Sequence, residues 1–348
     1  MTTVSEESRT QGADTRAKLA DVAERAGVSI STVSKVLNGR AGVSVDTRER
    51  VTGILHDEQY NRRGGAQPPS LLLELVCHAL DSPWMVEVVV GVERVARENG
   101  MSLVVTGMKD RRPGEGWIEG VLQRRPTGVI FVITDIPKAN QHQLRSHGIP
   151  FVIVDPEGDP AQDVPAIGSA NWMGGFLATR HLIELGHTRI ATLGGPVHFL
   201  AATARLSGYR AALAGAGLTE PHGYSPRGEF SHEAGAAAAR VLLMRDDPPT
   251  ALFAASDMQA LGAYEAAREL GLRVPDDVSV VGYDDLQVAQ WAGPPLTTVR
   301  QPLTEMAEEA TRLVLRLRAE PQLKSTRLEL ATSLVVRHST AAPTAGRA

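Results

Sequence analysis

Cysteine is almost absent from this chain of 348 residues, which has a single one at position 77. A lone thiol cannot form a disulfide within the chain, and cysteine-poor sequences are typical of reducing compartments. No apolar run approaches the roughly 20 residues of a transmembrane helix, and the first residues lack the basic-then-apolar pattern of a signal peptide. The sequence therefore predicts a cytoplasmic protein in which Cys77 is a buried, inert residue.

Recognisable catalytic motifs are lacking as well. The sequence contains no Gly-Lys-Ser/Thr phosphate-binding loop and no Gly-x-Ser-x-Gly turn. The segment 215–220, Gly-Ala-Gly-Leu-Thr-Glu, lacks the third glycine of a dinucleotide-binding fingerprint. The ten histidines are scattered without the spacing of zinc ligands. We therefore expect a protein that is not an enzyme and that holds no cofactor and no metal.

Charge of neither sign dominates the chain. The formal net charge is −4, which argues against binding of a polyanion over the whole surface, so any contact with DNA must be local. A composition of 43% hydrophobic and 22% charged residues is ordinary for a soluble globular protein. The length allows a small module together with one large or two medium domains.

The chain does contain two short amphipathic segments near its N-terminus. The apolar face of the first consists of Leu19, Val22, Ala23 and Ala26. Gly27 then allows a sharp turn, and a second helix is predicted from Ser31 to Asn38. The apolar face of the second consists of Val33, Val36 and Leu37. Two helices joined in this way form a helix-turn-helix, whose second helix enters a DNA major groove.

An ordinary pair of packed helices would show the same pattern, so the surrounding sequence decides. The outward face of the second helix is short, rich in hydroxyls and cationic: Ile30, Ser31, Ser34 and Lys35. A third amphipathic segment spans 44–59, and its apolar side consists of Val45, Val51, Ile54 and Leu55. Residues 15–63 contain nine Lys or Arg against six Asp or Glu, in a chain that is net acidic. These features favour a DNA-binding module.

Composition divides the chain into five parts. Residues 1–14 are polar and without periodicity, so we expect a disordered tail. Residues 15–60 form the helix-turn-helix domain, and residues 61–70, rich in glycine and proline, form a linker. Residues 71–339 form the core, and residues 340–348 are a second disordered tail.

In the core, short apolar runs alternate with amphipathic helices, as in Phe-Val-Ile-Val-Asp at 151–155. Continuous apolar strands separated by helices predict parallel sheets covered on both faces. Strands are also expected near 226–230 and, last, near 327–336. The fold class is thus a small all-α helix-turn-helix headpiece followed by an α/β core of two doubly wound subdomains. Ligands of such sheets bind beyond the carboxyl ends of the strands, here in a cleft between the subdomains.

Six segments resemble, in the correct order, the lactose/galactose/purine repressor (LacI/GalR) family of transcription regulators. They are DVAERAGVSISTVSKVLNG (21–39), VSVDTRERV (43–51), HLIELGHTRIATLGG (181–195), ARLSGYRAAL (204–213), GLRVPDDVSVVGYDD (271–285) and PPLTTVRQP (294–302). The resemblance, which covers residues 17–339, implies a DNA-binding headpiece, a periplasmic-binding-protein-like core that dimerises, and control by a small effector. It also implies three crossings between the subdomains. Subdomain 1 would then contain about 71–169 plus 302–326, and subdomain 2 about 170–300 plus 327–339.

For DNA, the resemblance places Ile30, Ser31 and Lys35 at base-reading positions. Their chemistry agrees, because lysine donates to guanine, serine pairs either way, and isoleucine packs on a thymine methyl. Ile30 has the alternative role of a half-buried packing residue. Residues suited to phosphate contacts, which set register without reading sequence, are Thr32, Ser34, Asn38, Arg62 and Arg63.

The linker departs from the family pattern. Family members carry a short hinge helix with a leucine that inserts into the minor groove, whereas this linker has no such leucine and contains helix breakers. Arg62 and Arg63 would then either lie in or beside the minor groove or belong to a plain flexible tether.

For the effector, the resemblance places nine residues in the cleft: Asp81, Trp84, Asp155, Asn171, Arg205, Phe230, Asp257, Asp284 and Gln301. Carboxylates and an arginine make paired hydrogen bonds to vicinal hydroxyls, and aromatic rings offer flat faces to a pyranose, so the set suits a neutral sugar. The family's aspartate before Asn171 is replaced here by Ala170, which removes one expected polar contact.

Several of these residues have plainer alternative roles. Asp284 could cap a helix, and Arg205 could be the partner of an internal ion pair. Phe230 and Trp172 could be ordinary core residues. Trp291 could line the cleft or merely close the crossover between the subdomains.

The sequence therefore predicts a homodimeric repressor of carbohydrate-utilisation genes, whose affinity for a pseudo-palindromic operator changes when a sugar-like effector binds. The alternative is a sugar-binding sensor or carrier without DNA function. A carrier would need a signal peptide and no helix-turn-helix, the reverse of what the sequence contains. A sugar-modifying enzyme would need a catalytic constellation that the sequence lacks.

Overall fold

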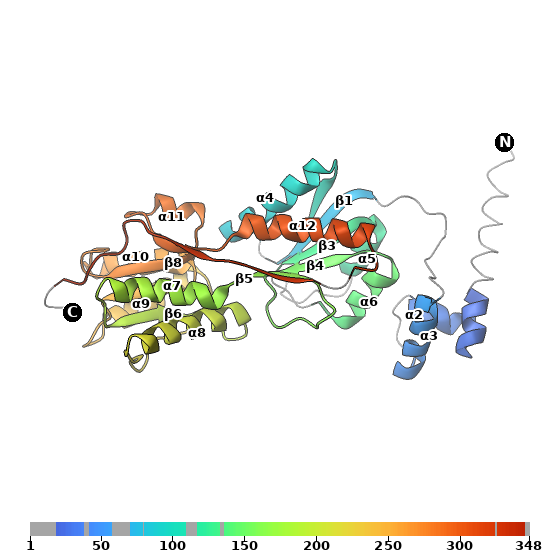
Figure 1. Ribbon diagram of the computed structural model, residues 1–348, viewed down its shortest axis with the longest axis horizontal. Coiled ribbons are helices and arrows are strands. Elements are labelled where there is room, and N and C mark those ends of the chain that lie inside the picture. Colours follow the sequence, from blue (N-terminus) through green and yellow to red (C-terminus); the bar gives the residue numbers. More distant parts are fainter. Residues whose placement is uncertain are drawn as a thin grey trace.

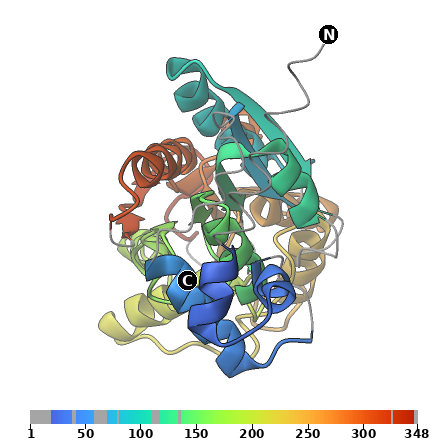
Figure 2. The ribbon, with the colours of Figure 1, turned by 90° about the vertical axis from the view of Figure 1, so that its right-hand side faces the viewer.

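The computed structural model describes residues 19–37, 42–57, 70–78, 80–108, 117–132, 136–323 and 326–344. Figure 1 shows a small helical headpiece and an elongated core made of two lobes, and the headpiece (blue) lies beside the first lobe. In Figure 2 the headpiece is nearest the viewer. Among the described residues, no helix is both long enough and apolar enough to cross a lipid bilayer.

The headpiece has the predicted helix-turn-helix arrangement. A helix over 19–26 is followed by α2 (Ile30–Leu37) and α3 (Val45–Asp57). Gly27 has φ +63, a left-handed conformation that glycine adopts at no steric cost and that turns the chain between the helices. The side chains that hold the headpiece together are Val22, Ala23, Ala26, Val33, Val36 and Val51. Val45, expected on the buried side, is 71% exposed because it is the first residue of α3, more than one turn before Val51.

The first subdomain is built on a six-stranded parallel sheet with the order β10-β5-β4-β3-β1-β2. Its strands are β1 (Ser70–Cys77), β2 (Ser102–Gly107), β3 (Pro126–Val132), β4 (Phe151–Val154), β5 (Ala166–Ser169) and β10 (Arg327–Leu330). Its helices are α4 (Pro83–Glu98), α5 (Trp117–Arg124), α6 (Lys138–Ser146) and α12 (Leu303–Ala319). Two buried apolar clusters, one packed against α4 and α12 and the other against α5 and α6, fill the two faces of the sheet.

The second subdomain has a five-stranded sheet with the order β11-β9-β8-β7-β6, in which only β11 is antiparallel. Its strands are β6 (Ile190–Leu193), β7 (Ala251–Ala254), β8 (Ser279–Asp284), β9 (Thr297–Arg300) and β11 (Ser333–Val335). Its helices are α7 (Asn171–Glu184), α8 (Leu200–Gly215), α9 (His232–Leu243), α10 (Asp257–Glu269) and α11 (Gln287–Trp291). Tight α7–α8 packing depends on Gly175, because a Cβ there would lie 2.1 Å from the Arg205 carbonyl oxygen.

The chain crosses between the subdomains three times, after β5, after β9 and after β10. The last crossing is later than expected, because residues 327–330 pair with β5 in the first sheet and only 333–335 join the second. The segment 327–336 is thus two short strands in different sheets and not one strand. The strand expected near 226–230 is also absent, since Arg227 makes only an isolated bridge with Gly194.

The predicted disordered tail from residue 340 is wrong for its first residues. Thr340 lies 3.0 Å from the His181 ring, and the Ala341 carbonyl oxygen lies 2.9 Å from Nε2 of buried His187. These contacts fix the start of the tail on the second subdomain, because a buried histidine needs partners for its ring nitrogens.

Candidate functional site

The base-reading residues predicted on α2 share its exposed face. Ile30 is 39% exposed and the side chains of Ser31 and Lys35 are exposed, whereas Val33 and Val36 are buried. Burial of one face and exposure of the other leave this short helix free to contact DNA with the predicted side. Thr32 and Ser34 are half-buried at its edges. Asn38, Arg62 and Arg63 lie outside the described residues, as do 1–14 and, apart from Ser70 at the start of β1, the predicted linker.

Ser29 is a helix-capping residue of the headpiece that our sequence reasoning missed. Its hydroxyl lies 3.2 Å from the Thr32 backbone N–H, which identifies it as the N-cap of α2. The same hydroxyl lies 2.7 Å from the Ser31 hydroxyl and 2.9 Å from the Thr32 hydroxyl. The cap thus orients two side chains of the predicted reading helix. A serine directly before the first apolar turn was the available signal.

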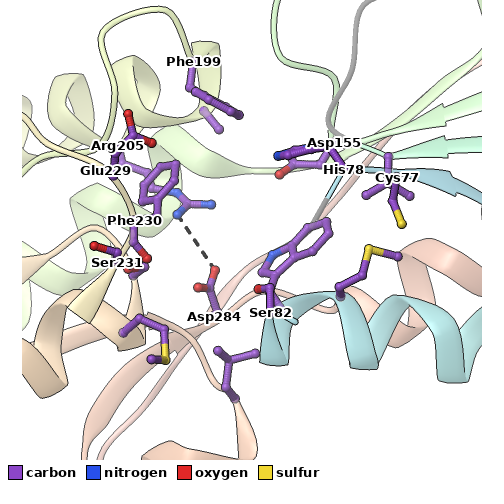
Figure 3. A pocket seen from close by; sticks show the side chains of 17 residues that line it. Cys77, His78, Ser82, Asp155, Phe199, Arg205, Glu229, Phe230, Ser231 and Asp284 are labelled. Carbon is purple, nitrogen blue, oxygen red and sulfur yellow. Dashed lines mark hydrogen bonds and ion pairs between the residues drawn. The ribbon is translucent and has the colours of Figure 1, made fainter. Parts of the chain in front are cut away.

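The core contains a cavity of about 250 Å³ between the two subdomains, at the carboxyl ends of the strands. It is lined from the first subdomain by Cys77, His78, Ser82, Trp84, Met85, Val132 and Asp155. From the second it is lined by Phe199, Ala201, Arg205, Glu229, Phe230, Ser231, Ser256, Met258, Asp284 and Leu286. Figure 3 shows Cys77, His78 and Asp155 on one side and Phe199, Arg205 and Phe230 on the other.

Arg205 is the most highly connected side chain of this cavity. Its Nε donates to Asn171 Oδ1 (2.8 Å), Nη1 to the Ala255 carbonyl oxygen (2.6 Å), and Nη2 to Gln301 Oε1 (3.1 Å). The guanidinium also lies 3.6 Å from the centre of the Tyr283 ring, a cation–π contact. The side chain is 4% exposed. Its orientation is therefore fixed before any ligand arrives, which lowers the entropic cost of binding.

Two carboxylates enter the cavity from strand ends with unusual backbone geometry. Asp155 directly follows β4 and has φ +49, whereas Asp284 ends β8 and has φ +112. Left-handed backbone at residues other than glycine is unfavourable and concentrates at functional sites. Burial raises the pKa of Asp155 and raises that of Asp284 well above its usual range, and nearby Arg205 opposes both shifts. The two carboxyl groups of the site therefore keep their protons to a higher pH than exposed aspartates do.

Aromatic rings form one wall of the cavity. Phe199 and Phe230 make an edge-to-face contact, with ring centroids 5.8 Å apart. Trp84 lines the cavity from the opposite side, on the first subdomain. Phe199 was missed by our sequence reasoning, because it precedes α8 in a loop without periodicity. Ser231 and Ser256 were missed as well, although serine before an apolar helix is a capping signal. Their hydroxyls accept from Ala234 N and Gln259 N.

Five of the nine predicted effector residues line the cavity together: Trp84, Asp155, Arg205, Phe230 and Asp284. Asn171 and Gln301 stand behind them as hydrogen-bond acceptors of Arg205. Asp257 is buried behind the wall, where its carboxylate accepts from Thr298 Oγ1 (2.5 Å) and from Leu286 N (2.7 Å). Burial raises its pKa to about 7. Asp81 is exposed and precedes the lining residue Ser82.

The structure tests the capping, ion-pair and core roles that were the alternatives for single residues. Asp284 caps no helix, because α11 begins at Gln287 with Leu286 at its N-cap. Arg205 does have internal partners, but its Nη1 approaches Asp284 Oδ1 only to 3.9 Å, the dashed contact of Figure 3. Trp172 is 44% exposed and stacks on Phe176, so it is not a core residue. Trp291 is 71% exposed and does not line the cavity.

The described residues contain no group of three or more His, Cys, Asp or Glu side chains that could hold a metal ion. Paired polar groups beside aromatic faces are instead suited to a small polar molecule with hydroxyl groups. Burial raises the pKa of the Cys77 thiol to about 11, so this lining residue is a thiol and a weak nucleophile near neutral pH.

Comparison with known proteins agrees with both parts of this description. Residues 18–62 match the family model of bacterial regulatory proteins of the lacI family, and residues 179–340 match that of a periplasmic binding protein-like domain. The chain is 36% identical to the ribose operon repressor of Escherichia coli (strain K12), with 93% of this chain and 99% of that protein covered.

Two solved structures extend the likeness to three dimensions. The transcriptional regulator CelR in complex with cellobiose is 36% identical, with a TM-score of 0.71 and coverage of 92% of this chain and 99% of that chain. The lac repressor dimer bound to operator and the anti-inducer ONPF is 30% identical, with a TM-score of 0.68 and coverage of 92% and 98%. The chain belongs to the lacI family of bacterial regulatory proteins.

Proposed function

We propose that this protein is a sequence-specific repressor of carbohydrate-utilisation genes, and that a small sugar bound between the core subdomains changes its affinity for the operator. One observation carries the proposal. The same chain presents an exposed polar helix face for DNA and a cavity in which the buried Asp284 carboxylate has an oxygen without a hydrogen-bond donor among the described residues. A buried polar atom of that kind implies a missing partner.

The DNA part of the proposal rests on α2. Ile30, Ser31 and Lys35 read bases in the major groove, and their shared exposure is what such contacts require. Thr32 and Ser34 contact phosphates and so set the position of the helix. The proposal extends to Asn38, Arg62 and Arg63 as further phosphate contacts, on their sequence alone.

The effector part of the proposal rests on the different roles that polar and aromatic residues have in the cavity. Asp155, Arg205 and Asp284 bind hydroxyl groups, because charged groups make the strongest hydrogen bonds in a site shielded from water. Trp84 and Phe230 pack against the apolar face of the sugar ring. Asn171, Asp257 and Gln301 support these groups, and Asp81 contacts the sugar from the rim. The similarity of the chain to a ribose operon repressor and to a regulator that was solved in complex with cellobiose supports a sugar as the effector.

Dimerisation is part of the proposal because the first subdomain exposes an apolar face. Val86 and Val90 lie one turn apart on α4, and Val105 lies on β2, the edge strand of the first sheet. Leu80 is exposed beside the β1–α4 connection. An unpaired edge strand with apolar neighbours is unfavourable in water and is typically covered by a partner. A second copy would also supply a second reading helix for the other half of a pseudo-palindromic operator. We place this assembly in the cytoplasm.

The test is to select binding sites from a pool of random duplexes with the full-length protein at low salt. The selected duplex is then titrated with protein in the presence of D-ribose, D-cellobiose or no sugar. We expect a palindromic consensus and an affinity at least about tenfold lower with one of the sugars, as for typical allosteric coupling. Recovery of an unselected pool would contradict the proposal. Sugar binding without any DNA preference would favour a sensor or carrier.

A further inference from the structure

Arg337, which follows β11 near the end of the chain, forms a largely buried ion pair with Asp285. The two atoms, Arg337 Nη2 and Asp285 Oδ1, are 2.5 Å apart, and each side chain is only 15% exposed. Neither residue lines the cavity. Arg337 also donates from Nη1 to the Leu296 carbonyl oxygen (2.7 Å), and its backbone N–H donates to Thr297 Oγ1 (2.9 Å). The guanidinium is thus fixed on the second subdomain.

The chain that carries Arg337 is itself firmly attached. Two residues later, Ser339 is fully buried, accepts from the Thr297 N–H (2.8 Å) and donates to the Val280 carbonyl oxygen (2.6 Å). The backbone at Arg337 is therefore held in place, unlike that of an arginine on a free tail.

The partner of Arg337 belongs to a turn with unfavourable backbone geometry. Asp284 has φ +112 and Asp285 has φ +59, so two consecutive residues other than glycine adopt left-handed conformations. Such a conformation persists only where the surrounding structure holds it. A largely buried, charge-assisted hydrogen bond to Asp285 is an interaction strong enough to do so.

Asp257 holds the next residue of the same turn from the other side. Its Oδ2 accepts from the Leu286 N–H (2.7 Å), while its Oδ1 accepts from Thr298 Oγ1 (2.5 Å). The turn 284–286 is thus fixed at Asp285 by a cation and at Leu286 by a carboxylate. The residues that it presents to the cavity are Asp284 and Leu286.

We propose that Arg337 and Asp257 are positioning residues, which hold the turn 284–286 so that the Asp284 carboxylate points into the effector cavity. The inference rests on the proposed function of that cavity, and it assigns to both residues a role without ligand contact. Loss of the Arg337 cation would let Asp285 leave its left-handed conformation and turn Asp284 away from the sugar. Arg337→Lys keeps a cation near Asp285 and should therefore still hold the turn 284–286 in place.

The primary test is hydrogen exchange of the full-length protein without sugar, because it does not depend on the identity of the effector. Arg337→Gln and Asp285→Asn are each expected to speed amide exchange in the segment 284–289 by about tenfold, with little change elsewhere in the second subdomain. Arg337→Lys should stay close to the unaltered protein. Arg240→Gln is the matched control, because it removes an arginine from a surface ion pair with Glu269 on the outer helices.

Unchanged exchange at 284–289 in both Arg337→Gln and Asp285→Asn would overturn the proposal. An equal increase over the whole second subdomain would also overturn it, because it would show a general loss of stability. The second readout is affinity for whichever of D-ribose or D-cellobiose binds the unaltered protein, expected to fall about tenfold in Arg337→Gln. If neither sugar binds, the proposed effector class fails, while the exchange result still decides whether Arg337 positions the turn.

Discussion

Arg205 Nη1 stands 3.9 Å from Asp284 Oδ1, too far for a hydrogen bond, and no described group donates one to that oxygen. The guanidinium is instead fixed by Asn171, Ala255 and Gln301. The two side chains thus face each other across a gap in the cavity wall without a hydrogen bond between them. A ligand hydroxyl that donates to Asp284 would fill this gap.

The first prediction concerns Asp284→Asn. A buried carboxylate with an unpartnered oxygen destabilises the effector-free protein, so the amide variant should melt at the same or a higher temperature. It should bind the sugar at least about tenfold more weakly, because the amide keeps only one of the two oxygens that can pair with ligand hydroxyls. Thermal denaturation and titration calorimetry measure the two effects. Asp276→Asn, at an exposed ion pair with Arg273, is the control and should change neither. Undiminished sugar affinity of Asp284→Asn would contradict our assignment of Asp284.

The second prediction concerns pH. The pKa of Asp257 is raised to about 7 by burial, whereas an unfolded aspartate has a pKa of about 3.9. Between these values only the folded chain keeps the proton, so raising the pH removes stability until about pH 7, beyond which the loss is complete. In Asp257→Asn the amide oxygen can still accept from Leu286 N–H and the amide nitrogen can donate to Thr298 Oγ1, but the side chain cannot ionise.

Denaturant midpoints at pH 5 and pH 8 test this prediction. The denaturant midpoint of the unaltered protein should fall more between the two pH values than that of Asp257→Asn. The difference between the two proteins isolates the contribution of Asp257 from those of Asp155 and Asp284, whose pKa values are also raised. Identical pH dependence of the two proteins would show that Asp257 does not titrate in this range.

The third prediction concerns the reading helix. Lys35→Ala and Ser31→Ala should each cost about 1–3 kcal/mol of discrimination at the base pairs they contact, while sugar affinity stays unchanged. Binding-site selection with each variant measures the first effect and calorimetry the second. Arg268→Ala, at an exposed arginine on α10 of the second subdomain, also removes one positive charge but outside the headpiece, and it is the control. Unaltered selectivity in both α2 variants would remove α2 as the reading element.

The fourth prediction concerns assembly. Val90→Arg places a charge on the exposed apolar face of α4 and should convert the dimer to a monomer, since burial of an unpaired charge at an interface is strongly unfavourable. Light scattering after size-exclusion chromatography measures the mass. Val241→Arg is the matched control, because Val241 is an equally apolar, exposed residue on α9 of the second subdomain. A monomeric unaltered protein, or a Val90→Arg protein that remains dimeric, would contradict the surface that we propose.

Sequence patterns were sufficient for the architecture because they reflect local physics. The 3.6-residue spacing of Val22, Ala23 and Ala26 predicted a buried helical face, and Gly27 predicted the turn, as the structure has them. The resemblance to the repressor family placed Asp155 and Asp284 in the cleft, and both line the cavity, at the ends of β4 in the first sheet and β8 in the second. The switch of sheets between β10 and β11 had no such signal, because Ala331 and Thr332 look no different from strand residues.

The cavity could be predicted only in part because side-chain direction at helix starts is not encoded by spacing. Ser256, Asp257 and Met258 are consecutive, yet the first and third line the cavity while the carboxylate of the second turns to Thr298. The roles of Phe199 and Arg337 could not be predicted, because each is set by a residue far away in the sequence. Their roles arise from tertiary contacts, namely with Phe230 and Asp285.

The central claim, that one sugar site controls one DNA site, is tested most directly by measuring sugar affinity twice. The sugar that binds the free protein is titrated into full-length protein alone and into the same protein saturated with its selected operator duplex. Linkage requires operator DNA to weaken sugar binding by the same factor by which sugar weakens operator binding. We predict equal factors of about tenfold or more. Equal sugar affinity for the free and the DNA-bound protein would contradict the account.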